Sequence, residues 1–562
     1  MNVADHLTDV AGRFPKLTAL VLTQVNGKPV PRWSTALTFS ELEAKTNRCA
    51  NGFLRIGITQ GMRVLVLVRP GFEFVAVMFA LFRLGSIPVL IDPGMGVARW
   101  LECIRDVNPA ALIGLPQAHA VRVLHGRTFR NTRINVTVGR KWFWGGSTLS
   151  EVETSSTGRF SAVTTKNDDP AAILFTSGST GPAKGVVYTH GMFGAQIRAI
   201  QGHYGIETGK EVDLPGFAPF ALFSVAMGMT TVFPNMDFSR PGRVDPARIF
   251  QSIHDYQVTS TFGSPAMWKR VAAYCIERNL QLPSLRRVMI AGAPVPGWLV
   301  EQIKSVLKAD ADVHTPYGAT EALPVTSMSG QELTSVDVTG LTPLAQSRAG
   351  RGTCVGVPVI GMAARLIRIT DDPILAWTDD LEVGFEEPGE IAVSGPVVTK
   401  EYFARPDDNR LSKVHEGDRV WHRMGDLGLK DAQGRIWFLG RKAHRVVTPS
   451  GTLFTEPCEA VFNEHLSVDR SALVGLGSRG QQTPVVIVEP KKDHWPRGKR
   501  TERFRNELLR LARAREHTRD IHTILFHRSL PVDVRHNAKI RREDLARWAA
   551  KQIGSSCPDG GS

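Results

Sequence analysis

The stretch Thr176-Ser-Gly-Ser-Thr-Gly-Pro-Ala-Lys-Gly185 carries the strongest signal in this chain. It follows the apolar run Ala171-Ala-Ile-Leu-Phe175, which predicts a strand. Small hydroxyl residues and glycines cannot fill a core, but their hydroxyls and backbone N–H groups can wrap a polyphosphate, with Lys184 adding positive charge. The stretch therefore predicts a loop for a nucleoside triphosphate, and a plain glycine-rich surface turn is the alternative. It is not a Walker P-loop, because Gly185 stands where that motif needs a Ser or Thr for Mg²⁺.

Length and composition indicate a large globular protein with more than one domain. The chain has 562 residues, whereas single cores stop growing near ~250–300 residues. The longest apolar run, residues 74–82, is far shorter than the ~20 residues that span a bilayer, and it predicts a buried helix. No secretory signal follows Met1, and the six cysteines form no Cys-x-x-Cys pair. We therefore expect a cytoplasmic protein without a zinc site or a disulfide framework.

The net charge of +14 is concentrated toward the C-terminus, most densely in residues 491–519. Within that segment, residues 501–513 repeat apolar side chains at helical spacing, which predicts a solvated basic helix face. No zinc finger, RNA-binding fingerprint or interleaved aromatic residues accompany the charge, so we expect no nucleic-acid partner. Docking to an anionic membrane surface, a carrier protein or a partner enzyme remains as an alternative.

The order of patterns along the chain predicts an α/β fold in two domains. From about residue 20 to 440, β-branched runs alternate with helical patterns, which indicates layered α/β subdomains with largely parallel sheets. Residues 350–439 hold short runs broken by turns, which predict a small antiparallel, β-barrel-like subdomain. The chain then becomes basic and α+β in character. We predict a large N-terminal domain over 1–440, a small mobile C-terminal domain over 441–553 and a disordered tail over 554–562.

Four later segments complete the pattern, and together with the glycine-rich stretch they resemble the adenylate-forming (ANL) superfamily. They are Ala291-Gly-Ala-Pro-Val-Pro296, Pro316-Tyr-Gly-Ala-Thr-Glu321, the segment from Met424-Gly-Asp426 to Gly440-Arg441, and Leu530-Pro-Val-Asp-Val-Arg-His-Asn-Ala-Lys-Ile-Arg541. This superfamily contains acyl-CoA synthetases, peptide-synthetase adenylation domains and luciferases. For the second segment, an ordinary strand-to-helix turn with a carboxylate in the first helical turn is the structural alternative.

The resemblance implies ATP and Mg²⁺ as cofactors and assigns roles to named residues. Lys539, Glu321, Thr176 and Lys184 would be catalytic, with Lys539 clamping the carboxylate and the α-phosphate, and with Glu321 and Thr176 as Mg²⁺ ligands. Tyr317 would stack on adenine and Asp426 would bind the ribose hydroxyls. The implied nucleotide contacts are Ser177, Gly178, Ser179, Thr180, Gly181, Gly292, Ala293, Pro294, Tyr317, Gly318, Thr320, Asp426 and Arg441.

This chain departs from the superfamily pattern in segments that concern the second half-reaction, in which a nucleophile displaces AMP from the acyl-adenylate. The usual hinge Gly-Arg-x-Asp is here Gly440-Arg-Lys-Ala443, and Pro449 stiffens the segment that follows. Together with the rest of the sequence, these features resemble the OleC-type olefin β-lactone synthetases of bacterial long-chain hydrocarbon biosynthesis. That resemblance implies adenylation of a 2-alkyl-3-hydroxy fatty acid, closure to a β-lactone, and possible protein partners in a hydrocarbon-biosynthesis assembly. A long-chain acyl-CoA ligase, an acyl-AMP ligase and a non-catalytic scaffold are the alternatives.

Two apolar stretches are candidates for the wall of a long-chain pocket. They are Phe217-Ala-Pro-Phe-Ala-Leu-Phe223 and Ala226-Met-Gly-Met-Thr-Thr-Val-Phe233. Contiguous apolar runs are also typical of buried strands in α/β proteins, so a plain core role is the equal alternative.

Overall fold

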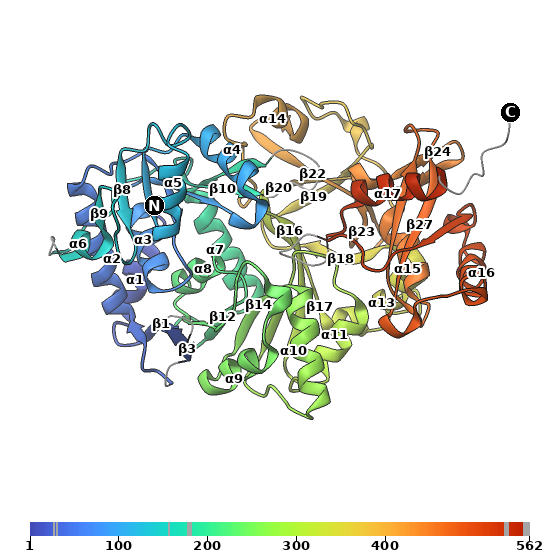
Figure 1. Cartoon of the computed structure of the whole chain (residues 1–562), viewed down its shortest axis with the longest axis horizontal. Coiled ribbons are helices and arrows are strands. Elements are labelled where there is room, and N and C mark those ends of the chain that lie inside the picture. Colours follow the sequence, from blue (N-terminus) through green and yellow to red (C-terminus); the bar gives the residue numbers. More distant parts are fainter. Residues whose placement is uncertain (26–27, 30–31, 155–157, 177–182, 533–538, 555–562) are drawn as a thin grey trace.

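The computed structural model describes residues 1–25, 28–29, 32–154, 158–176, 183–532 and 539–554 (Figure 1). A seven-stranded sheet, mostly parallel, forms the first layer in the order β11-β10-β6-β5-β7-β8-β9. Its strands are β5 (Arg63–Leu67), β6 (Ile87–Ile91), β7 (Ala111–Gly114), β8 (Ile134–Thr137), β9 (Ser147–Thr148), β10 (Pro170–Thr176) and β11 (Lys184–Thr189). As predicted, the glycine-rich stretch follows a strand.

Helices cover both faces of this sheet. One face packs against α2 (Phe39–Arg55), α3 (Phe72–Arg83) and α7 (His190–Tyr204), and the other against α4 (Val97–Val107). The helix α3 confirms the buried helix predicted for residues 74–82, since every residue of that run is buried. At the start of α2, the Thr38 hydroxyl and the Glu41 carboxylate form a reciprocal capping box, which satisfies backbone N–H groups at the first turn.

A fourteen-stranded sheet forms the second layer, and α1 (Asp5–Arg13), α3, α7 and α8 (Phe220–Ala226) contribute to the core shared by the two sheets. Its largely parallel part contains β1 (Thr18–Leu22), β4 (Ala36–Thr38), β12 (Val212–Pro215), β13 (Thr230–Phe233), β14 (Ser260–Gly263), β15 (Arg287–Ile290) and β16 (Asp312–Ala319). Helices α9 (Pro246–Tyr256), α10 (Pro265–Glu277) and α11 (Gly297–Lys304) pack with these strands.

The remaining strands of this sheet are antiparallel, as predicted for residues 350–439, but the predicted barrel-like shape is wrong. They are β17 (Ala322–Ser329), β18 (Thr353–Pro358), β19 (Ala363–Ile367), β20 (Gly389–Ser394), β21 (Lys413–Glu416), β22 (Arg419–Lys430) and β23 (Ile436–Arg441). Because β18 pairs with β17 through Ser327 and Val357, these strands extend the large open sheet. Within the described residues no closed barrel forms.

The C-terminal part has its own small cores. Its elements are β24 (Val446–Thr448), β25 (Gly451–Leu453), α15 (Thr455–Asn463), β26 (Val468–Leu476), β27 (Thr483–Pro490), α16 (Lys499–Arg513), β28 (Thr523–Phe526) and α17 (Arg542–Gly554). The sheet β26-β27-β28 packs α15 and α16 on one face and α17 on the other. Phe504, Leu508 and Ala512 are buried on α16, which confirms the amphipathic helix expected there.

The topology leaves a site at the carboxyl ends of the parallel strands, where open α/β sheets bind ligands. The end of β10 and the segments after β14 and β15 meet there, and the C-terminal part lies against this edge (Figure 1). Among the described helices, none is both long and apolar enough to cross a membrane.

Candidate active site

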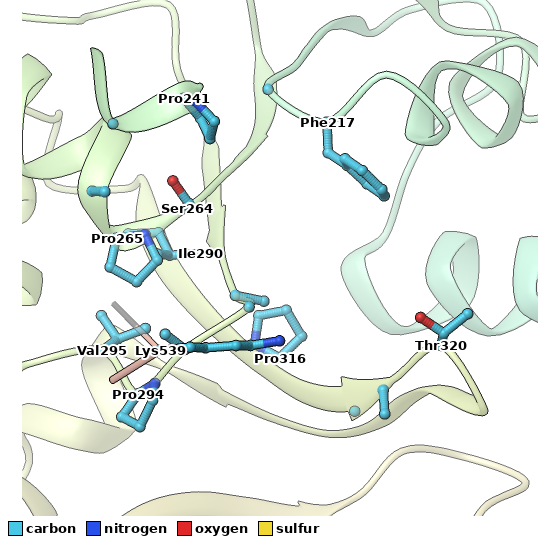
Figure 2. A pocket seen from close by; sticks show the side chains of 18 of the residues that line it. Phe217, Pro241, Ser264, Pro265, Ile290, Pro294, Val295, Pro316, Thr320 and Lys539 are labelled. Carbon is cyan, nitrogen blue, oxygen red and sulfur yellow. The ribbon is translucent and has the colours of Figure 1, made fainter. Parts of the chain in front are cut away.

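One cavity of about 3280 Å³ brings together the predicted site residues other than Thr176, which ends β10, and those of the β10–β11 loop. These residues are Lys184, Gly292, Ala293, Pro294, Tyr317, Gly318, Thr320, Glu321, Asp426, Arg441 and Lys539. They come from β11, from the turn after β15, from the β16–β17 hairpin, from β22 and β23, and from the segment before α17. Figure 2 shows Lys539 reaching across the pocket toward Pro316, with Phe217 and Ser264 farther along its walls.

The ends of the predicted phosphate loop are held together by the sheet. Thr176 ends β10, and its backbone pairs with Lys184 at the start of β11. The Lys184 ammonium lies 2.7 Å from a carboxylate oxygen of Asp408 and 5.0 Å from the centroid of the Tyr402 ring. The residues Ser177, Gly178, Ser179, Thr180 and Gly181 lie outside the described part of the chain. The structure therefore positions the base of the loop and the lysine.

Glu321 lies in the turn between β16 and β17, so the alternative of a helix-capping carboxylate is wrong. The Tyr402 hydroxyl donates a hydrogen bond of 2.8 Å to Glu321 Oε1, and the Thr399 N–H donates one of 2.8 Å to the Glu321 backbone carbonyl. The carboxylate is half-buried at the cavity wall and keeps further acceptor capacity. This arrangement fits Mg²⁺, which is commonly held by one or two carboxylates together with substrate phosphates.

Tyr317, Asp426 and Arg441 form a connected group in the same cavity. The Tyr317 hydroxyl donates a hydrogen bond of 2.7 Å to Asp426 Oδ2, and the Arg441 guanidinium lies 2.9 Å from Asp426 Oδ1. Burial raises the pKa of Asp426, whereas the charges of Arg441 and Lys539 oppose that rise. Burial and the neighbouring Asp426 carboxylate raise the pKa of the Tyr317 hydroxyl, so it stays a neutral donor. The group can present a fixed carboxylate beside an aromatic ring.

Lys539 precedes α17 and enters the cavity from the C-terminal part (Figure 2). Its charge contributes to the pKa of Asp426, so the two side chains share one electrostatic environment. The nearby Arg542 guanidinium holds both carboxylate oxygens of Glu459, at 2.6 and 2.8 Å. This ion pair fixes the start of α17 against α15, and through it the chain segment that carries Lys539.

Comparison with known proteins decides the family. The family described as AMP-binding enzyme matches residues 7–403. This chain belongs to that family. It is 43% identical over 561 residues to proteins named olefin beta-lactone synthetase from Stenotrophomonas maltophilia and Xanthomonas campestris pv. campestris, covering 98% of each chain. It is 24% identical to the long-chain-fatty-acid–CoA ligase FadD13 of Mycobacterium tuberculosis, covering 88% of this chain and 89% of that protein.

Solved structures share the fold of this AMP-binding enzyme at low identity. The amide bond synthetase McbA from Marinactinospora thermotolerans matches with a TM-score of 0.77 and 19% identity, covering 98% of this chain and 100% of that chain. The o-succinylbenzoate coenzyme A synthetase MenE from Bacillus subtilis, in complex with ATP and magnesium ion, matches with a TM-score of 0.72 and 20% identity, covering 96% and 98%. The mixed α/β architecture predicted from the sequence is thereby confirmed.

In this AMP-binding enzyme, the segment at the hinge position is tied to the N-terminal part by its charged neighbours. Ala443 is exposed in the short turn η5 (Lys442–His444). The Lys442 ammonium donates to Glu390 Oε2 and to the Thr370 carbonyl, each at 2.9 Å. The Arg445 guanidinium lies 2.9 Å from Asp371. The side chain at position 443 itself makes no ion pair, since alanine offers none.

The apolar stretches predicted as pocket wall or core serve both roles in this AMP-binding enzyme. Phe217, Phe220 and Phe223 line the cavity, and the Phe220 ring stacks on Phe262 with centroids 4.1 Å apart. Val225 and Val232, by contrast, are fully buried in the cores. The part of the cavity wall formed by these rings is therefore aromatic and apolar.

Sequence reasoning missed three polar residues behind Glu321. Tyr402 lies between two cations, with Lys184 and Lys413 at 5.0 and 5.7 Å from its ring centroid. Lys413 is buried and donates to the Thr399 carbonyl, and its burial lowers the pKa of its ammonium to about 7. His422 is also buried at the cavity, and burial lowers its pKa well below the usual value. None of the three belongs to a motif, and the fold brings Lys413 and His422 together as paired residues of β21 and β22.

Proposed function

We propose that this chain is an ATP-dependent ligase that adenylates a long-chain 2-alkyl-3-hydroxy acid and closes it to a β-lactone, releasing AMP and pyrophosphate. The observation that carries the proposal is the 43% identity to proteins named olefin beta-lactone synthetase, over 98% of both chains. Proteins named as CoA ligases or synthases reach only 24–26% identity. The lactone-forming function is therefore favoured over thioester formation, which uses the same adenylation residues.

In the first step, a carboxylate oxygen of the acid attacks the α-phosphorus of ATP, and the bond to the pyrophosphate oxygen breaks. We propose that Lys539 holds the carboxylate and the α-phosphate, and that Lys184 holds the outer phosphates with the hydroxyls of the β10–β11 loop. Both cations line the same cavity, which supports these roles. Catalysis would then rest on positioning and on neutralising developing charge.

The nucleoside would be held by the Tyr317–Asp426–Arg441 group and by the turn at Gly292, Ala293 and Pro294. An ionised carboxylate can accept hydrogen bonds from two ribose hydroxyls, and the Arg441 guanidinium favours the ionised form of Asp426 by opposing the effect of burial on its pKa. The tight turn allows the adenine base to approach the backbone closely, because Gly292 has no side chain and a positive φ of 96°.

We propose that Glu321 and Thr176 hold Mg²⁺. The ion would supply positive charge at the phosphates during adenylation. Tyr402 would orient the Glu321 carboxylate through its hydrogen bond of 2.8 Å, and Lys413 would hold the Tyr402 ring in place from behind.

In the second step, the β-hydroxyl oxygen attacks the acyl carbonyl carbon, its proton leaves to a base or solvent, and the bond to AMP breaks. Nucleophile and carbonyl belong to one molecule, so good alignment can correspond to effective molarities of ~10⁵ M or more. The apolar wall around Phe217 and Phe220 would exclude water from the adenylate. No separate acceptor molecule, such as coenzyme A, is needed to displace AMP.

The test is product identification by mass. The full chain is incubated with MgATP and a 2-alkyl-3-hydroxy acid, with and without coenzyme A. We expect β-lactone and AMP in both reactions. A thioester as the main product in the presence of coenzyme A would favour the acyl-CoA ligase, and a stable adenylate would favour the acyl-AMP ligase. Absence of any pyrophosphate release would favour a nucleotide-binding scaffold.

We also propose a cytoplasmic enzyme that can work beside other enzymes of the same pathway. The five cysteines in the described residues are all free and buried, which suits a reducing compartment.

A further inference from the structure

Four large apolar side chains are exposed at the end of α5 (Pro116–Leu124) and in the loop between β8 and β9, two adjoining elements. The exposed fractions are 44% for Val123, 79% for Leu124, 54% for Trp142 and 80% for Phe143. Single exposed apolar residues are ordinary, but a group of four that includes two large aromatic side chains calls for an explanation. We call these four residues the α5 patch.

The α5 patch is held in place from below by a buried aromatic pair. Trp144 is buried, stacks on His119 of α5 with centroids 5.6 Å apart, and donates from its indole N–H to the Thr137 hydroxyl at 3.0 Å. The rings of Trp142 and Phe143 lie 5.2 and 5.4 Å from that of Trp144. The loop is therefore anchored to α5, so the outward position of its aromatic side chains is part of the fold.

The segment of the chain that carries the α5 patch has positive charges and no negative ones. No Asp or Glu occurs between Asp106 and Glu151. The exposed arginines in this segment are Arg127, Arg130, Arg133 and Arg140. Over the described part of the chain, none of the four has a carboxylate within ion-pair distance. Lys141 has one at 3.7 Å, from the exposed Glu151.

The inner side of α5 lines the large cavity. Gln117, Ala118 and Val121 contribute from α5, and Val97 and Trp100 from α4. Residues 117, 118 and 121 lie on one helix face at helical spacing. The cavity that contains Lys539 and Glu321 thus extends to the element that carries the exposed patch.

We propose that the α5 patch docks this enzyme onto an anionic lipid bilayer. Tryptophan and phenylalanine partition into the membrane interface, and each nearby Arg or Lys adds attraction to anionic headgroups. The combination of exposed aromatic side chains, unneutralised arginines and an adjoining apolar cavity fits a lipid surface better than a nucleic acid, which would require base-stacking or groove contacts. The inference rests on the proposed function, because a long-chain acid resides in membranes and could enter the cavity beside α5.

The chain offers an internal control for charge alone. Helix α16 is also basic, with exposed Arg510 and Arg513, but it presents its apolar residues Phe504 and Leu508 to the core. In Figure 1, α5 and α16 lie in opposite halves of the molecule. Substitutions on α16 can therefore separate a specific docking face from general attraction of a basic protein.

The experiment measures co-sedimentation of the full chain with vesicles. One set contains phosphatidylcholine alone, and the other contains phosphatidylcholine and phosphatidylglycerol in equal amounts. We expect binding to the anionic set only, and a reduction of about tenfold or more for Arg127→Glu/Arg130→Glu and for Trp142→Ser/Phe143→Ser. The matched Arg510→Glu/Arg513→Glu variant should bind nearly as the parent does.

Pyrophosphate release with a short, water-soluble 3-hydroxy acid serves as the control for folding, and it should be unchanged in all three variants. Equal vesicle binding by the parent and both α5-patch variants would overturn the proposal, and so would an equal loss in the α16 variant. Vesicle binding requires no turnover. A failure of docking is therefore distinguishable from a failure of the proposed lactone chemistry, which product analysis tests separately.

Discussion

At the scale of single residues, we expect the loss of the Lys539 side chain to impair the chemistry without impairing the folding. It lies just before α17, lines the cavity and is otherwise exposed, so the cores of the C-terminal part do not depend on it. We expect Lys539→Ala to reduce adenylate formation by ~10²–10³, the typical effect of removing one preorganised contact at a developing charge. The measurement is pyrophosphate release. The control is Lys551→Ala, an exposed lysine of α17. Unchanged pyrophosphate release from Lys539→Ala would contradict the assignment.

Substitutions of Glu321 and of Tyr402, which donates a hydrogen bond to it, should raise the Mg²⁺ requirement to different extents. Glu321→Gln replaces the charged oxygen with a neutral amide, a poorer Mg²⁺ ligand. Tyr402→Phe keeps the ring between Lys184 and Lys413 but removes the hydroxyl that donates to Glu321. We expect the Mg²⁺ concentration for half-maximal turnover to rise on the order of tenfold for Tyr402→Phe. The rise should be larger for Glu321→Gln. A Mg²⁺ dependence identical to the parent in Glu321→Gln would show that Glu321 is only structural.

At the scale of elements, the turn η5 is one of the places where the C-terminal part is attached to the N-terminal part. Lys442 and Arg445 bind Glu390, Thr370 and Asp371 of the N-terminal part, whereas Ala443 between them is exposed. A polar hinge residue matters where the small domain must rotate to admit a thiol. An internal hydroxyl removes that need, so Ala443→Asp should leave the rate of β-lactone formation within about twofold of the parent, since exposed surface changes are usually small. A tenfold loss would mean that the hinge position controls this step.

The contact between α15 and β18 predicts a dependence on pH. The Thr353 hydroxyl donates to Glu456 at 3.1 Å, and burial raises the pKa of Glu456 to about 7, with Glu459 adding to the rise and Arg542 opposing it. A carboxyl whose folded pKa is raised stabilises the folded state below its unfolded value, and that contribution is lost as the pH rises through the folded pKa. From pH 5 to pH 8 the melting temperature of the parent should therefore fall more than that of Glu456→Gln, by roughly a few °C. If the melting temperatures of the parent and of Glu456→Gln changed equally with pH, Glu456 would be solvated and its pKa would not be raised.

The elements themselves show where local sequence patterns suffice. The strand before the glycine-rich loop, the buried helix α3 and the amphipathic helix α16 follow from hydrophobic spacing alone. The barrel-like subdomain was wrong because strand partners are distant in sequence, and the pairing of Ser327 with Val357 has no local signature. The hairpin at Glu321 joins neighbouring strands, yet its motif is equally compatible with a strand-to-helix turn. Tyr402, Lys413 and His422 were missed because their grouping depends on tertiary contacts among β21, β22 and the segment that carries Tyr402, whereas Asp426 and Lys539 stand in contiguous motifs.

At the scale of the whole molecule, the two halves close over one cavity, and the nature of the acceptor should appear in the overall kinetics. If the β-hydroxyl is the nucleophile, AMP release from a 2-alkyl-3-hydroxy acid should not depend on coenzyme A concentration. The matching acid without the hydroxyl should release AMP at least about a hundredfold more slowly, since it loses an intramolecular nucleophile of high effective molarity. Pyrophosphate release in a single turnover should remain similar for both acids, because adenylation does not use the hydroxyl. Fast thioester synthesis from the plain acid and coenzyme A would instead establish an acyl-CoA ligase.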